Sequence, residues 1–133
     1  MSMIDDSQEM LTKYGVLDWV ETAPPEKRRL LLNFRLAMLN EELQETFQAV
    51  ENRDPEEVVD GLIDLMVIAI GTLNMFRVDV QRAWDEVHTA NMNKEVGIKP
   101  SRPNPMGLPD LIKPNGWVSP SHANNHGLLT EIL

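Results

Sequence analysis

Hydrophobic residues recur at helical spacing through most of the chain before Lys94. Steps of three and four residues place side chains on one face of an α-helix, so this pattern predicts helices. Four are expected, over about residues 4–14, 26–51, 54–76 and 80–93. Leu17–Thr22 is expected to be a connector. Short loops between helices favour antiparallel neighbours, so the pattern predicts an all-α fold with a four-helix core.

Two breaks in the pattern carry clear signals for the start of a helix. Pro24–Pro25 stops the chain or begins the second helix, because proline suits the first helical turn. Asp54 can cap the third helix, Pro55 suits its first position, and Glu57 completes a capping box. The two longest helices are therefore joined only by the short turn before Pro55.

The composition changes after Lys94. Residues 98–120 hold most of the nine prolines in the chain, which excludes a continuous helix. Apolar residues such as Leu111 and Trp117 are worth burying, so we expect an ordered tail or hairpin. Residues 122–133 are expected to form a short last helix or a frayed end. The chain thus divides into a helical domain over residues 1–96 and a Pro-rich tail over 97–133, which packs on the domain or on a neighbouring subunit.

The third helix is apolar on nearly every side, yet it carries Asp60 and Asp64. Such a helix is normally buried, and buried carboxylates are costly unless they are paired, protonated or bound to metal. The apolar run Gly61–Phe76 is shorter than the about 20 residues that a membrane span needs. The first ten residues contain three acids and no apolar run, so no signal peptide is expected. A soluble, cytoplasmic protein without a membrane partner is the prediction.

The charge of the chain narrows the range of partners. Twelve Lys and Arg stand against twenty-one Asp and Glu, which gives a formal net charge of −9. No basic stripe is present, so a nucleic-acid polymer is not expected to bind. The chain has no cysteine, which excludes disulfides and thiol catalysis.

Glu41, Glu42 and Glu45 lie on the predicted second helix. Neighbouring glutamates on a helix commonly form a solvated surface. If the second and third helices pack antiparallel across their connecting turn, however, these glutamates face Asp60 and Asp64. Converging carboxylates repel one another, and hard divalent cations such as Mg²⁺ or Mn²⁺ relieve that repulsion. The arrangement therefore favours a divalent metal site.

Two other interpretations compete with this one. Asp60 or Asp64 could instead form a core ion pair with a buried arginine, such as Arg35 or Arg82. A di-iron centre would require Glu-x-x-His on each of two helices. The nearest approach is a single Asp85-x-x-His88, so iron is a poor fit.

Asn91 and Lys94 end the fourth helix and could offer a hydrogen-bond donor and a positive charge to a phosphate. The same residue types are also ordinary choices at a helix C-terminus. His88 could equally be a neutral, packed histidine. Trp117 is either part of a core or a cover for a nucleobase.

The combined motifs resemble a known group of enzymes. Glu-Glu-x-x-Glu on one helix, Asp-Gly-Leu-x-Asp-Leu on the next, and Val-His-x-x-Asn-Met-x-Lys after them are similar to the all-α nucleotide pyrophosphohydrolase superfamily. This superfamily includes MazG-like enzymes, dimeric dUTPases and phosphoribosyl-ATP pyrophosphohydrolases. The resemblance covers about Leu36–Lys94. The tail Lys113-Pro-Asn-Gly-Trp-Val-x-Pro resembles that of short phage-type members, in particular the MazZ branch, which acts on guanine nucleotides.

The resemblance implies a MazG-like enzyme that cleaves a (d)NTP to (d)NMP and pyrophosphate, in a bacterial or phage-infected cell. It implies a homo-oligomer, either a dimer or a dimer-of-dimers tetramer. Two or three Mg²⁺ ions, replaceable by Mn²⁺, would bind to Glu42, Glu45, Asp60 and Asp64. Many members have Glu-x-x-Asp on the third helix, so Glu57 could replace Asp60 as a ligand.

Within the same resemblance, Glu41 would orient or deprotonate the attacking water, while Asn91 and Lys94 would steady the phosphates. The preference for guanine rests on the tail alone. Phosphoribosyl-ATP or dUTP is the alternative substrate. A non-catalytic helical module, with its acids in ion pairs between subunits, is the alternative from a different class.

Overall fold

The computed structural model describes residues 2–102 and 104–133. Met1, which begins the expected catalytic domain, and Pro103, one proline of the expected tail, lie outside the described residues. The chain separates into two compact units, one running up to Val80 together with Asn124–Leu133, and the other comprising Gln81–Ala123. Each unit is described by itself. The elements are α1 (Met3–Lys13), α2 (Val16–Thr22), α3 (Pro25–Glu51), α4 (Pro55–Met75), α5 (Val80–Met92), β1 (Glu95–Gly97), β2 (Asp110–Ile112) and the 3₁₀ helix η1 (Gly127–Glu131).

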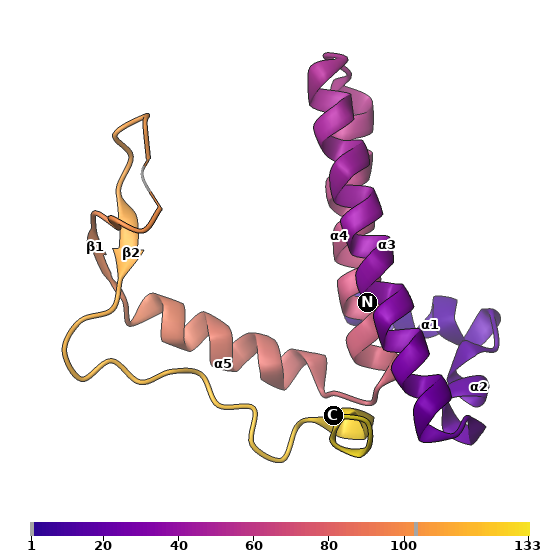
Figure 1. Ribbon diagram of the computed structural model, residues 1–133. Helices are drawn as coiled ribbons and strands as arrows, with labels where there is room; N and C mark the ends of the chain where they lie inside the picture. The colour runs from indigo at the N-terminus through magenta and orange to yellow at the C-terminus, as the bar shows by residue number, and fades with distance from the viewer. Residues whose placement is uncertain (1, 103) are drawn as a thin grey trace. The chain divides into compact units, whose positions relative to one another are not determined.

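An all-α fold is confirmed, and its main feature is the antiparallel hairpin of α3 and α4 (Figure 1). A side chain on Gly61 would overlap the hydroxyl of Thr46, so the two backbones approach closely there. Arg35 Nε donates to Thr72 Oγ1 at 3.0 Å. Thr46 follows Arg35 by eleven positions, and Thr72 follows Gly61 by eleven positions, so both contacts share one register. This register decides which side chains of the two helices face each other.

The ends of these two helices follow from local chemistry. Pro25 occupies the first turn of α3, as its fixed φ favours. The side chain of Asp54 accepts a hydrogen bond from the Glu57 N–H at 3.1 Å and caps α4. The predicted boundaries at these positions are confirmed.

The core of the first unit lies at the end of the hairpin away from the turn at residues 52–54. Met75 and Phe76, where α4 ends, pack with Leu11 of α1 and Val20 of α2. The predicted connector Leu17–Thr22 is wrong, because residues 16–22 form α2. Val20 is only 1% exposed, so packing against the core keeps this short segment helical.

The second unit contains most of α5 and a two-stranded antiparallel sheet. Glu95 pairs with Ile112, and Gly97 pairs with Asp110, so an ordered hairpin follows α5 as expected. Trp84 on α5 is 66% exposed. The expected division into residues 1–96 and 97–133 stays a prediction.

The α3–α4 hairpin exposes many large apolar side chains. On α3 these include Phe34 and Phe47, and on α4 they include Val59, Leu62 and Ile63. α4 is also long and apolar enough to cross a membrane, by length and composition only, with a mean hydropathy of 1.7. One such helix is weak support for a membrane span, because a helix of a soluble core passes the same test.

Candidate active site on the α3–α4 hairpin

Three of the candidate acids lie in the five residues before Thr46 on α3. Glu41 and Glu45 are exposed, whereas Glu42 is partly buried. The Thr46 hydroxyl donates to the Glu42 carbonyl oxygen at 2.8 Å, which directs this side chain along its own helix. The close contact between Thr46 of α3 and Gly61 of α4 therefore lies next to these acids.

The other two acids flank Gly61 on α4. Asp60 precedes this glycine and is exposed, while Asp64 follows it by almost one turn and is partly buried. Because α4 runs antiparallel to α3, residues after Gly61 lie beside residues before Thr46. The register thus brings Asp64 alongside Glu42, as the sequence predicts for an antiparallel pair.

The electrostatics of Glu42 show how closely these acids are grouped. Partial burial raises the pKa of the Glu42 carboxyl above its ordinary value, and the charges of Glu45, Asp64, Glu41 and Asp60 raise it further. Asp60, one of the two candidates for a third ligand on α4, is among these neighbours. Glu42 is therefore at the centre of a strongly negative field.

The expected alternative of a core ion pair is not found for Arg35. Its guanidinium donates to Thr72 Oγ1 and, at 3.1 Å, to the Ile68 carbonyl oxygen. Burial lowers the pKa of this arginine. Among residues 2–102 and 104–133, neither Asp60 nor Asp64 forms a salt bridge. Arg82 belongs to the second unit, where it donates to the Ala123 carbonyl oxygen.

The donor set suits a hard divalent cation, because it offers only carboxylate oxygens and an uncompensated negative charge. In the described part of the chain, no three Asp, Glu or His side chains are gathered tightly enough to hold one ion as they stand. The assignment of Glu42, Glu45, Asp60 and Asp64 as ligands stays a prediction, as does the choice between Asp60 and Glu57.

Asn91 and Lys94 lie in the second unit, where α5 ends. Both are partly buried, and the Lys94 N–H donates to the Asn91 carbonyl oxygen at 3.1 Å. The Lys94 ammonium lies over the Trp117 ring, 5.4 Å from its centroid. His88 is exposed, so it is not a packed core histidine. The role of Asn91 and Lys94 toward phosphates stays a prediction.

Two features of these sites were missed at the sequence level. The Thr46–Gly61 contact was one of them, although a glycine beside two aspartates in an apolar helix is a signal of close helix approach. The other was Lys113, whose ammonium lies 5.0 Å from the centroid of the same Trp117 ring. Nothing local in the sequence links Lys113 to Lys94, because residues 95–112 separate them.

Comparison with known protein families agrees with this geometry. The model of the phosphoribosyl-ATP pyrophosphohydrolase family matches residues 17–91, which include the whole α3–α4 hairpin. No individual curated protein matches the chain. Enzymes of this family hydrolyse phosphoric anhydride bonds and are soluble and typically cytoplasmic. The match spans more than half of the chain, so the protein belongs to the phosphoribosyl-ATP pyrophosphohydrolase family, within the all-α MazG-like nucleotide pyrophosphohydrolase superfamily.

Proposed function

We propose that the protein is a divalent-metal-dependent pyrophosphohydrolase that cleaves a (d)NTP to (d)NMP and pyrophosphate. The main supporting observation is the electrostatic field at Glu42, a partly buried residue beside four further carboxylates on two facing helices. Within the described residues, neither Asp60 nor Asp64 forms a salt bridge with a Lys, Arg or His side chain. A cluster of this kind suits metal-bound polyphosphate, whereas a structural role would call for a counter-ion within the protein.

In this proposal Glu42, Glu45, Asp60 and Asp64 hold Mg²⁺ or Mn²⁺, with two or three ions at each site. Bound ions of this type neutralise phosphate charge, lower the pKa of water and stabilise the leaving pyrophosphate. Their positive charge also explains how a protein with a net charge of −9 binds a polyanion.

The chain's own groups take the remaining roles. Glu41 is exposed next to Glu42, and it accepts the proton of the attacking water. The water oxygen forms a bond to the α-phosphorus, and the bond from this phosphorus to the bridging oxygen breaks. Pyrophosphate leaves with that oxygen. Asn91 and Lys94, in the second unit, are proposed to bind phosphate.

A homo-oligomer, dimer or dimer-of-dimers tetramer, is part of the proposal. The apolar side chains exposed on α3 and α4 support it, because monomeric proteins rarely expose many large apolar residues on one pair of helices. The cytoplasm of a bacterial or phage-infected cell is the proposed location.

Guanine nucleotides are the proposed preference, on the strength of the tail resemblance around Lys113–Pro120. Phosphoribosyl-ATP is the second candidate substrate, because the family that matches the chain is named for it. Both substrates would be cleaved at the same type of bond by the same carboxylates.

The test is pyrophosphate release from the eight common (d)NTPs and from phosphoribosyl-ATP, with Mg²⁺, with Mn²⁺ and with a chelator. Metal-dependent release concentrated on dGTP and GTP is the expected result. Release from phosphoribosyl-ATP alone would replace the substrate and keep the chemistry, and release spread over all bases would remove the guanine preference. Absence of release from every compound would favour the non-catalytic helical module.

A further inference from the structure

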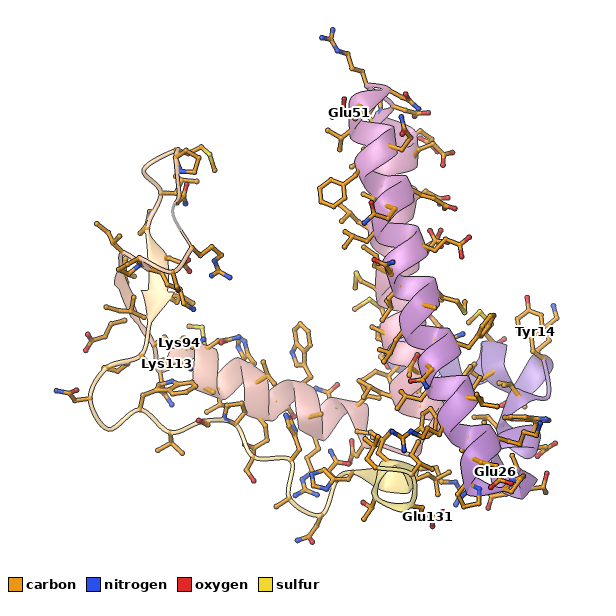
Figure 2. The ribbon with its side chains drawn as sticks, viewed as in Figure 1. Tyr14, Glu26, Glu51, Lys94, Lys113 and Glu131 are labelled. Carbon is orange, nitrogen blue, oxygen red and sulfur yellow. The ribbon has the colours of Figure 1, made fainter. Side chains whose placement is uncertain are left out.

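Two lysines share one indole ring in the second unit. The Lys94 ammonium lies 5.4 Å and the Lys113 ammonium 5.0 Å from the centroid of Trp117. Figure 2 shows both lysines close together where α5 ends. Each ammonium is attracted to the electron-rich face of the ring.

The strand register makes this arrangement. Because Glu95 pairs with Ile112 in the antiparallel sheet, Lys94, just before β1, and Lys113, just after β2, come next to each other beyond this pair. Gly97 packs against the Ile112 side chain, whose δ1 carbon would lie 2.6 Å from a Cβ at residue 97. Arg102, in the segment that connects β1 to β2, forms a salt bridge with Asp110.

Trp117 is held independently of the lysines. Its indole N–H donates to the Ala90 carbonyl oxygen at 2.7 Å. Ala90 lies in the last turn of α5, where carbonyl oxygens have no partner within the helix. The ring is thus fixed to the helix end, and it presents its face to the two ammonium groups.

Two positive charges at opposite positions of a hairpin repel each other. Among residues 2–102 and 104–133, neither Lys94 nor Lys113 forms a salt bridge that would offset this. The charge of the unit fits the same picture. Residues 81–123 contain five Lys and Arg against four Asp and Glu, so this unit has a formal charge of +1. The other unit has a formal charge of −10, which gives the total of −9. A multiply charged anion is the partner that relieves the repulsion.

We propose that Lys94 and Lys113 form a two-lysine clamp for the phosphate chain of the nucleotide, with Trp117 as the positioning residue that holds both. This inference rests on the proposed function and adds to it a second phosphate-binding lysine. Lys113 and Trp117 lie outside residues 17–91, so the clamp is a feature of this chain beyond the matched part. It also gives Trp117 a use other than stacking on a base.

The first test measures binding without turnover. In a Trp19→Phe/Trp84→Phe protein, Trp117 is the remaining tryptophan. Titration with pyrophosphate and tripolyphosphate, in the presence of a chelator, should change its fluorescence saturably. Lys113→Ala should weaken this binding roughly tenfold, as expected for a charge-assisted contact. Lys99→Ala removes the same charge within the same unit and should leave the affinity unchanged, while Lys113→Arg should retain most of it.

Three results would overturn the clamp: no saturable response to either anion, equal weakening by Lys113→Ala and Lys99→Ala, or a response to a nucleoside without phosphate. The last would assign Trp117 to the base instead. Because no hydrolysis is needed, this binding assay separates failure of the clamp from failure of the proposed reaction.

The second test uses the active enzyme with its best substrate. Lys113→Ala should raise KM several-fold and leave kcat nearly unchanged, because the lysine holds phosphate and takes no part in proton transfer. Trp117→Leu should raise KM in the same way, and Trp117→Phe, which keeps a ring face, should restore part of the loss. A fall in kcat at constant KM would contradict the assignment.

Discussion

At the scale of single residues, Glu42 is a glutamate whose surroundings in the folded chain disfavour its charged form. Partial burial and four neighbouring carboxylates raise the pKa of its carboxyl, so the folded protein holds the proton of Glu42 more tightly than the unfolded chain does. Stability contributed by this group is therefore present at low pH and is lost as pH rises through the raised value. A cation bound between the helices would reverse that loss.

The first prediction follows from this loss of stability with rising pH. In a chelator, Glu42→Gln should match the parent protein below the ordinary glutamate pKa of 4.5 and exceed its stability at neutral pH. Urea unfolding at a series of pH values measures the difference. Glu51→Gln, at the outer end of the hairpin (Figure 2), is the matched control, because it makes the same substitution at an exposed glutamate. A Glu42→Gln protein that is less stable at pH 7 would contradict the argument.

Asp64 separates a metal ligand from a structural acid. Asp64→Asn should leave stability unchanged or raised in a chelator, because the carboxylate forms no salt bridge within the described residues. Turnover should fall at least about 100-fold, the usual cost of losing charge stabilisation at a reacting centre. Pyrophosphate release measures the turnover. The shift in melting temperature on adding Mg²⁺ or Mn²⁺ should also be smaller in the variant than in the parent protein. A large loss of stability without metal would instead indicate a structural ion pair.

At the scale of the elements, one small contact sets the spacing of α3 and α4. Gly61 leaves room for the Thr46 hydroxyl, and a Cβ at residue 61 would lie closer than 3.0 Å to it. Thr46 is β-branched and bonded to the Glu42 carbonyl oxygen, so its side chain cannot swing aside freely. The acids on both helices flank this contact, and its spacing therefore also sets their separation.

Gly61→Ala should cost about 1–3 kcal/mol of stability, as overpacking usually does. In a Thr46→Ala background the same change should be close to neutral, because the overlapping oxygen is gone and alanine favours a helix over glycine by up to about 1 kcal/mol. Urea unfolding of the four proteins of this double-mutant cycle gives the coupling energy. Equal costs of Gly61→Ala in both backgrounds would show that the contact does not control the spacing.

At the scale of the whole molecule, the end of the chain completes the first unit. The Leu128 N–H donates to the Phe76 carbonyl oxygen at 2.7 Å, and Glu131 pairs with the buried Arg28. Asn125 bonds to both the N–H and the carbonyl oxygen of Asp79. Residues 124–133 are thus part of the core of this unit, even though the Pro-rich segment separates them from it in sequence.

Two adjacent residues test this role. Ile132 is 7% exposed and Leu133 is 79% exposed. Ile132→Ala should destabilise the protein by about 2–5 kcal/mol, the range for deleting a buried aliphatic side chain. Leu133→Ala should change stability by less than about 0.5 kcal/mol. Similar values for both variants in urea unfolding would mean that the C-terminal segment does not belong to the core.

The sequence by itself determined the helices α3 and α4, their antiparallel pairing and the presence of acids on both facing helices. Helical periodicity, proline and capping residues act over a few positions, so the sequence specifies them locally. The short turn at residues 52–54 favours antiparallel packing of the two helices that it joins. The motif order on these helices was also enough to identify the superfamily. The ligand and catalytic roles of the acids stay predictions.

Only the tertiary structure decided the remaining features. Residues 16–22 become a helix because Val20 packs in the core, and residues 124–133 join the first unit through contacts with Arg28 and Phe76. The pairing of Lys94 with Lys113 depends on the register of a sheet whose strands are separated by a loop. Each of these depends on contacts between residues distant in sequence, and no local pattern of polar and apolar residues specifies such contacts.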